Sequence, residues 1–139
     1  MRKLFHFDCP REVYQADAVA ISCYDARFDL AIRKFLKRRG VLLFDNLKIA
    51  GSVKALAADG PDRDFVLRMV RISLALHHPP RAILIAHNDC GAYSGAPPDA
   101  IAADVLRAAQ FLRSAEPSLP VECYFADFDG VYAIAEPRP

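Results

Sequence analysis

Ala82-Ile83-Leu84-Ile85-Ala86 is the clearest strand in this sequence, and His87 follows it directly. An apolar run of this length is typical of a strand that is buried on both faces of a sheet. Both neighbouring segments predict helices. Residues 62–77 carry apolar side chains at helical spacing until His78-Pro79-Pro80 ends the pattern, and we expect a second helix at 99–115.

The remaining chain continues this alternation of strands and helices. We expect strands at 19–22 and 41–44, with an amphipathic helix at 28–39 between them that ends at Gly40. Near the C-terminus, strands at 121–126 and 131–135 flank an Asp-Gly pair that signals a hairpin turn. The alternation predicts a three-layer α/β/α fold with a mostly parallel, roughly five-stranded sheet and an antiparallel C-terminal edge strand.

The length and charge of the chain narrow its class. With 139 residues, 53% of them hydrophobic, we expect one domain over 1–139, with a short N-terminal arm at 1–18 and a frayed tail at 136–139. Eighteen basic and 17 acidic side chains give a net charge of +1, which argues against nucleic-acid or charged-membrane partners. The sequence lacks an apolar run of roughly 18 residues and a signal-peptide pattern, so we expect a cytoplasmic protein.

The chain has four cysteines, and reducing conditions would oppose disulfides between them. Metal binding or simple burial is therefore the better expectation for each. Cys9 and His6 could form a metal site of their own, although a surface position is the simpler interpretation. Cys123 falls inside an expected strand and is interpreted as a core residue.

Two polar clusters follow expected strands. Cys23, Asp25 and Arg27 come after the first strand, whereas His87 and Cys90 come after the strand at 82–86. The carboxyl ends of parallel strands share one edge of the sheet, where ligands bind in such folds. Two thiolates and an imidazole suit Zn²⁺, and three protein ligands leave a fourth position for water or substrate. The clusters together predict a zinc site.

Each of these residues also has a structural interpretation. Cys23 and Cys90 could be buried small hydrophobes, and His87 could be a loop histidine with its hydrogen bonds satisfied. Asp25 and Arg27 could form an ordinary surface ion pair. The joint position of all five residues at strand ends favours the zinc site over these alternatives.

The pattern Cys-x-Asp-x-Arg, followed further along by His-x-x-Cys-Gly, resembles the β-class carbonic anhydrase family. Ile49-Ala50-Gly51 stands where that family has Asn-Ala-Gly, and the stretch at 87–91 is similar to its His-Thr-Asp-Cys-Gly. Residues 121–130 are similar to its final strand pair. The resemblance runs from about Val19 to Ala135, and it is most specific at the two clusters.

The resemblance implies a function and its residues. Cys23, His87 and Cys90 would bind one Zn²⁺, and Asp25 and Arg27 would form the family's carboxylate–guanidinium dyad. The implied reaction is reversible hydration of carbon dioxide to bicarbonate by a zinc-bound hydroxide. The small residues Gly51 and Gly91 would let the substrate approach closely. The resemblance also implies a homodimer or a higher homo-oligomer.

Other functions remain open because Ile49 replaces the family's usual asparagine and the N-terminal arm is short. One alternative is hydrolysis of a sulfur analogue of carbon dioxide, carbonyl sulfide or carbon disulfide. Another is a non-catalytic module that zinc stabilises. A cysteine-based redox protein is a third alternative, but the sequence lacks a Cys-x-x-Cys motif.

Overall fold

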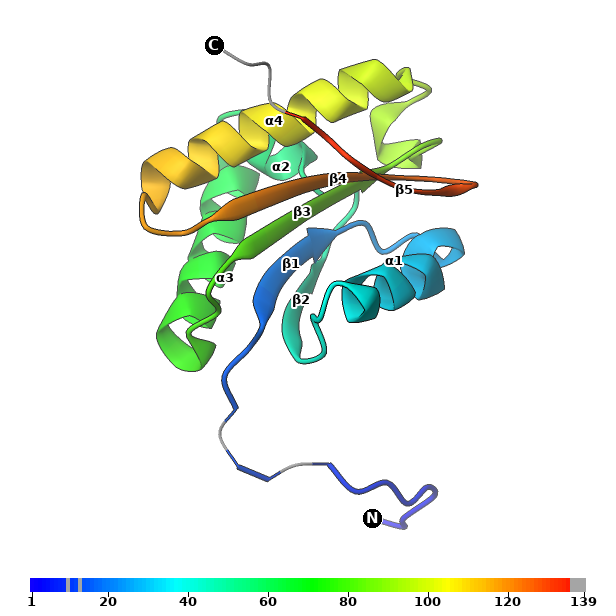
Figure 1. Cartoon of the computed structure of the whole chain (residues 1–139), viewed down its shortest axis with the longest axis vertical. Coiled ribbons are helices and arrows are strands. Elements are labelled where there is room, and N and C mark those ends of the chain that lie inside the picture. The colour runs from blue at the N-terminus through cyan, green and yellow to red at the C-terminus, as the bar shows by residue number, and fades with distance from the viewer. Residues whose placement is uncertain (10, 13, 136–139) are drawn as a thin grey trace.

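A five-stranded sheet in the order β2-β1-β3-β4-β5 forms the centre of the molecule (Figure 1). The computed structural model describes residues 1–9, 11–12 and 14–135, so the expected tail at 136–139 lies outside it. The elements along the chain are β1 (Ala18–Ser22), α1 (Ala26–Arg38), β2 (Phe44–Lys48), α2 (Lys54–Ala57), α3 (Pro61–His77), β3 (Ala82–His87), a short 3₁₀ helix η1 (Gly91–Tyr93), α4 (Pro98–Ala115), β4 (Val121–Asp127) and β5 (Gly130–Ala133).

The sheet has the predicted mixture of directions. β1 pairs in parallel with both β2 and β3, and β3 pairs in parallel with β4. β5 runs antiparallel to β4 at one edge, after a tight turn at Phe128 and Asp129. The predicted fold class is therefore confirmed, including the antiparallel C-terminal edge strand.

Helices cover both faces of the sheet, so the molecule has three layers (Figure 1). Helix α1 packs on one face, where Phe28, Ile32 and Leu36 meet the side chains of Ile83 and Ile85. Helices α2, α3 and α4 cover the other face over a larger apolar core. Every residue of β1 and β3 is buried, which explains the continuous apolar runs of these two central strands.

The helices begin and end close to the predicted residues. Asp25 is the N-cap of α1, and its carboxylate accepts a hydrogen bond from the Arg27 backbone N–H. Gly40 follows α1 with a φ of 76°, a conformation that favours glycine. Helix α3 ends where His78 takes up a left-handed conformation before the two prolines.

The second strand was predicted at the wrong residues. We expected residues 41–44, but β2 spans Phe44–Lys48. Leu42 and Leu43 are exposed instead, and their backbone N–H groups donate to the Asp17 carboxylate, at 2.8 and 2.9 Å. An apolar run pointed to a buried strand, whereas β2 is a half-buried edge strand whose polar residues give no such pattern.

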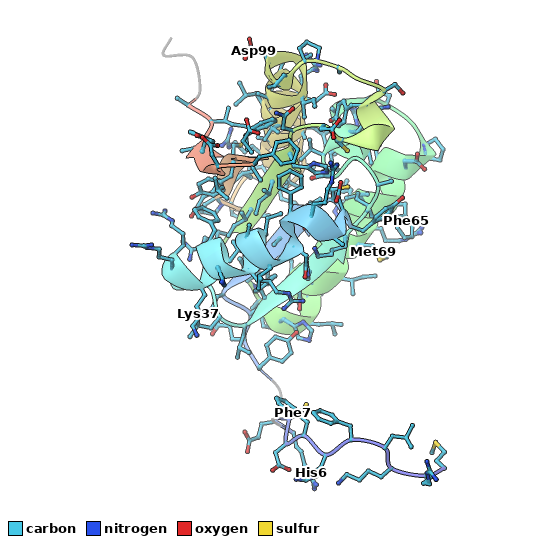
Figure 2. The ribbon with its side chains drawn as sticks, turned by 90° about the vertical axis from the view of Figure 1, so that its right-hand side faces the viewer. His6, Phe7, Lys37, Phe65, Met69 and Asp99 are labelled. Atoms are coloured by element: carbon cyan, nitrogen blue, oxygen red, sulfur yellow. The ribbon has the colours of Figure 1, made fainter. Side chains whose placement is uncertain are left out.

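The N-terminal segment extends away from the layered body. Residues 1–9 are exposed, and Figure 2 shows His6 and Phe7 on this segment, well apart from Lys37 on α1 and from Phe65 and Met69 on α3. Among the described residues, no helix is long and apolar enough to span a bilayer.

Candidate metal centre

Three potential metal ligands converge at the carboxyl ends of the two central strands. Cys23 follows β1, His87 ends β3, and Cys90 lies three residues further in the loop that leads to η1. One ligand atom from each lies within 4.8 Å of the other two. All three side chains are buried, with 6%, 2% and 4% of their surfaces exposed. The structure thus brings together the three residues that the sequence analysis selected as ligands.

The imidazole of His87 is oriented for one further partner. Its Nδ1 lies 2.7 Å from the Asn88 carbonyl oxygen, which can only accept, so Nδ1 carries a proton, and the tautomer that this leaves for a neutral imidazole has its lone pair on Nε2. This Nε2 is buried and has no hydrogen-bond partner among the described residues. The Phe28 ring packs beside the imidazole, with the two centroids 4.5 Å apart. A buried acceptor without a donor is costly, and a bound cation would satisfy it.

The two thiols also form a donor set that suits zinc. Both are free cysteines, and neither takes part in a disulfide. Burial raises the pKa of the Cys90 thiol, and the neighbouring Cys23 raises it further, while backbone N–H groups of Ala92 and Gly51 oppose the change. Two adjacent thiolates repel each other in a buried site unless a cation neutralises them. Together with the His87 imidazole they fit a zinc site with three protein ligands.

A carboxylate lies at the edge of this cluster. Asp25 Oδ2 is 4.0 Å from His87 Nε2 and 2.7 Å from Arg27 Nη2, and the carboxylate also accepts from Arg27 Nε at 3.1 Å. The hydrogen bonds from Arg27 outweigh the opposing effect of burial and lower the pKa of Asp25 to about 2. At neutral pH, Asp25 is therefore a charged hydrogen-bond acceptor beside the three ligand atoms.

Arg27 has further partners that the sequence analysis did not identify. Its Nη1 donates to Asp89 Oδ2 at 2.8 Å, and its Nη2 donates to the Asp89 carbonyl oxygen at 3.0 Å. The Phe128 ring, from the β4–β5 turn, lies 5.8 Å from Arg27 Cζ. Asp89 stands between two predicted ligands, which could have drawn attention to it. The position of Phe128 depends on how the final hairpin packs, for which the sequence carries no signal.

An apolar hollow of about 350 Å³ opens beside the cluster. Both expected substrate-binding glycines, Gly51 and Gly91, line it together with the two cysteines and the carboxylate. Tyr24, which follows Cys23 in the chain, also lines it. The full lining is Cys23, Tyr24, Asp25, Ala50, Gly51, Cys90, Gly91 and Ala92. Its size and apolar character suit a small, uncharged molecule.

The loop after β2 forms one wall of this hollow by a close approach. Gly51 has a φ of 71°, and a Cβ built on it would lie 3.0 Å from the Cβ of Ala92. The next residue, Ser52, is buried with a φ of 51°, and its hydroxyl donates to the Ile85 carbonyl at 2.6 Å. These contacts fix the loop across the ends of β1 and β3. Lys54, two residues after Ser52, also holds the loop, because its Nζ donates to the Ala92 carbonyl at 2.5 Å.

The other candidate residues lie elsewhere. Cys9 is exposed on the N-terminal segment with His6, and the predicted ligand cluster is the only potential metal-binding group among the described residues. Cys123 is a buried residue of β4, as predicted.

The sequence of this protein matches one known family. Residues 14–135 fit the profile of the family described as "Putative carbonic anhydrase". The chain belongs to the carbonic anhydrase family. No curated protein sequence matches this family member significantly.

Among solved structures, this carbonic anhydrase family member has the fold of the β class. The carbonic anhydrase of Streptococcus mutans aligns with a TM-score of 0.68 and 16% identity, over 94% of this chain and 89% of the other. A tetrameric β-carbonic anhydrase of Sordaria macrospora aligns with a TM-score of 0.56 and 12% identity, over 91% and 84% of the two chains. A carbon disulfide hydrolase in its apo form aligns with a TM-score of 0.50 and 12% identity, over 89% of this chain and 82% of the other. At these identities the likeness concerns the fold.

Proposed function

We propose that this protein is a zinc enzyme that catalyses the reversible hydration of carbon dioxide to bicarbonate. The observation that carries this proposal is the buried Cys23–His87–Cys90 cluster, whose imidazole Nε2 has no partner among the described residues and faces a charged carboxylate. Membership of the carbonic anhydrase family supports the same activity. When bound, zinc would supply a nucleophile at neutral pH by lowering the pKa of a coordinated water toward 7.

The residues around the cluster would have separate roles. Cys23, His87 and Cys90 would hold the metal, and the Asn88 carbonyl would keep the imidazole in the tautomer that ligation requires. Asp25, fixed by Arg27, would accept a hydrogen bond and so orient the attacking oxygen. The apolar hollow beside Gly51 and Gly91 would admit uncharged carbon dioxide.

Metal content and hydration rate together test this proposal. We expect about one zinc per chain in the purified protein, as a three-ligand site predicts, and rapid proton release when carbon dioxide is mixed with it in a stopped-flow instrument. Cys90→Ala should lose the metal and the activity. Cys123→Ala, which removes a buried cysteine outside the cluster, should retain both.

A second variant separates chemistry from metal binding. Asp25→Asn keeps the shape of the side chain but removes its charge, so it should retain zinc and lose about 10²-fold or more in hydration rate. A wild-type protein that holds one zinc but does not hydrate carbon dioxide would refute the proposed activity and leave a metal-stabilised module as the interpretation. Full zinc uptake by Cys90→Ala would refute the proposed ligand set.

A second candidate activity is hydrolysis of a sulfur analogue of carbon dioxide. The carbon disulfide hydrolase with the same fold favours it, and the apolar hollow suits such a molecule as well as carbon dioxide. Hydrogen sulfide release from carbon disulfide or carbonyl sulfide, measured on the same zinc-loaded sample, distinguishes the two activities. The larger kcat/KM, compared between carbon dioxide and the sulfur analogue, would identify the preferred substrate.

We infer that the protein acts as a homo-oligomer in a reducing compartment such as the cytoplasm. Leu42 and Leu43 expose 63% and 51% of their surfaces next to edge strand β2, and apolar residues so exposed favour burial against another chain. The Sordaria macrospora enzyme with this fold is a tetramer. A reducing compartment would keep Cys23 and Cys90 as thiols able to bind metal.

A further inference from the structure

The guanidinium of Arg27 joins two loops that come from different strands. Toward the loop after β1, Nε and Nη2 donate to the Asp25 carboxylate. Toward the loop after β3, Nη1 donates to Asp89 Oδ2 at 2.8 Å and Nη2 donates to the Asp89 carbonyl at 3.0 Å. The two aspartates therefore hold adjacent edges of one planar cation, and both accept from Nη2.

Two aromatic rings also lie close to this cation. Arg27 Cζ lies 5.7 Å from the centroid of the Phe28 ring and 5.8 Å from that of Phe128. The two rings are themselves in contact, with centroids 5.3 Å apart, and Phe28 packs against the His87 imidazole. Rings within about 6 Å of a guanidinium attract it. A third segment, the β4–β5 turn, thus reaches the same group.

Core packing does not explain these two additional partners. Phe128 keeps 66% of its surface exposed, so it contributes little buried area. Asp89 is an exposed loop residue with a φ of 51°, a conformation that is uncommon outside glycine. What the two side chains share is contact with Arg27.

We propose that Asp89 and Phe128 are positioning residues that hold Arg27, and through it the Asp25 carboxylate, beside the Cys23–His87–Cys90 cluster. The inference rests on the proposed function, because it assigns Asp25 a role in that reaction. The Arg27 side chain is 48% exposed, and an exposed ion pair with Asp25 alone would leave its long side chain free to reorient. Anchoring from Asp89 and contact with Phe128 restrict the guanidinium to one orientation.

The orientation matters because Asp25 Oδ2 is shared. The same oxygen lies 2.7 Å from Arg27 Nη2 and 4.0 Å from His87 Nε2. A reorientation of Arg27 would let the carboxylate rotate, so that the oxygen facing the cluster would move. Displacements of about 1 Å in such a group lower rates by up to about 10²-fold without affecting affinity for the metal.

Asp89→Asn, which keeps the shape of the side chain, and Phe128→Leu, which removes the aromatic ring, test the proposal. Asparagine tolerates the positive φ and keeps the backbone carbonyl that accepts from Nη2, but it loses the charge. Asp129→Asn and Tyr132→Leu are matched controls in the final hairpin, where the Tyr132 hydroxyl bonds Asp129. Phe128→Tyr should restore the wild-type behaviour because it restores the ring.

The first readout follows Arg27 itself and needs no activity. In ¹H–¹⁵N spectra of the zinc-loaded protein, the exchange of the Arg27 Nε proton with water should become about tenfold faster in Asp89→Asn and Phe128→Leu. Both controls and Phe128→Tyr should match the wild type. The second readout is kinetic: kcat for carbon dioxide hydration should fall about tenfold, with KM and zinc content unchanged within about twofold.

Each outcome decides the inference. Unchanged exchange of the Nε proton in both variants would overturn it, and so would faster exchange with an unchanged kcat in an active enzyme. A loss of zinc in either variant would show a structural role instead. If the wild-type protein proves inactive toward carbon dioxide, the proposed function fails, and the exchange rates still decide whether Asp89 and Phe128 hold Arg27.

Discussion

Replacing Gly51 with alanine should destabilise the protein more than the same change at Gly40, because Gly51 lies in the wall of the hollow beside the Cys23–His87–Cys90 cluster. Gly51 and Gly40 share almost the same backbone conformation, with φ values of 71° and 76°. They differ in their surroundings. A Cβ on Gly40 would meet nothing within 4 Å, whereas one on Gly51 would lie 3.0 Å from the Cβ of Ala92 and 3.3 Å from that of Lys54. Gly40→Ala is therefore a matched control.

The magnitude follows from two contributions. A left-handed conformation costs an alanine about 1–2 kcal/mol at either position. The crowding at Gly51 adds about 1–3 kcal/mol, because both neighbouring atoms are fixed to the backbone and the loop must move to relieve it. Effects on the unfolded chain are equal for the two variants and cancel. Gly51→Ala should therefore lose about 1–3 kcal/mol more than Gly40→Ala.

Urea unfolding of the metal-free proteins, followed by circular dichroism, measures this difference. With a slope of about 1–3 kcal/mol per molar urea, the midpoint of Gly51→Ala should lie about 1 M below that of Gly40→Ala. Equal midpoints for the two variants would refute the claim that close packing against Ala92 fixes this loop. A midpoint for Gly40→Ala below that of Gly51→Ala would contradict it more strongly.

Two further predictions concern stability and assembly. Burial opposes ionisation of Asp45, but hydrogen bonds from Ser73, Tyr14 and His77 outweigh it and lower its pKa below 3.8. Asp45→Asn should therefore lose about 1–3 kcal/mol of unfolding free energy at about pH 7. This difference from the wild type should shrink as the pH falls through the lowered pKa of Asp45, because the wild-type carboxylate is then protonated. A difference that stays the same in acid would contradict the prediction. Replacing Leu42 and Leu43 by lysine should convert the proposed oligomer to a monomer by light scattering, unlike Leu30→Lys on α1.

The central strands could be predicted from sequence because their environment is uniform. β1 and β3 are buried along their whole length, so each residue is apolar or small until His87. Edge strand β2 was misplaced because three of its five residues are polar (Asp45, Asn46 and Lys48), while the preceding leucines are exposed. The four-residue helix α2 and the short η1 were not predicted, since neither is long enough to show a periodic pattern.

The candidate site was predictable to a similar degree. Parallel strand pairing between β1 and β3 made the convergence of Cys23 with His87 foreseeable, because both follow strands that end at one edge. The contacts around Arg27 were not foreseeable. They depend on the rotamer of Arg27, on the left-handed conformation of Asp89 and on where the β4–β5 turn packs relative to Arg27. Local sequence patterns specify none of these.

The wide separation of the ligands along the chain has a consequence for folding. Cys23 can meet His87 only after β1 has paired with β3, a contact that closes a long segment of chain at a cost in entropy. A metal ion captured at this point would act as a reversible cross-link and would bind the folded chain in preference to the unfolded one. A growing chain on the ribosome would thus complete its chelating site only once its central strands had joined, so metal capture would report that β1 and β3 had paired.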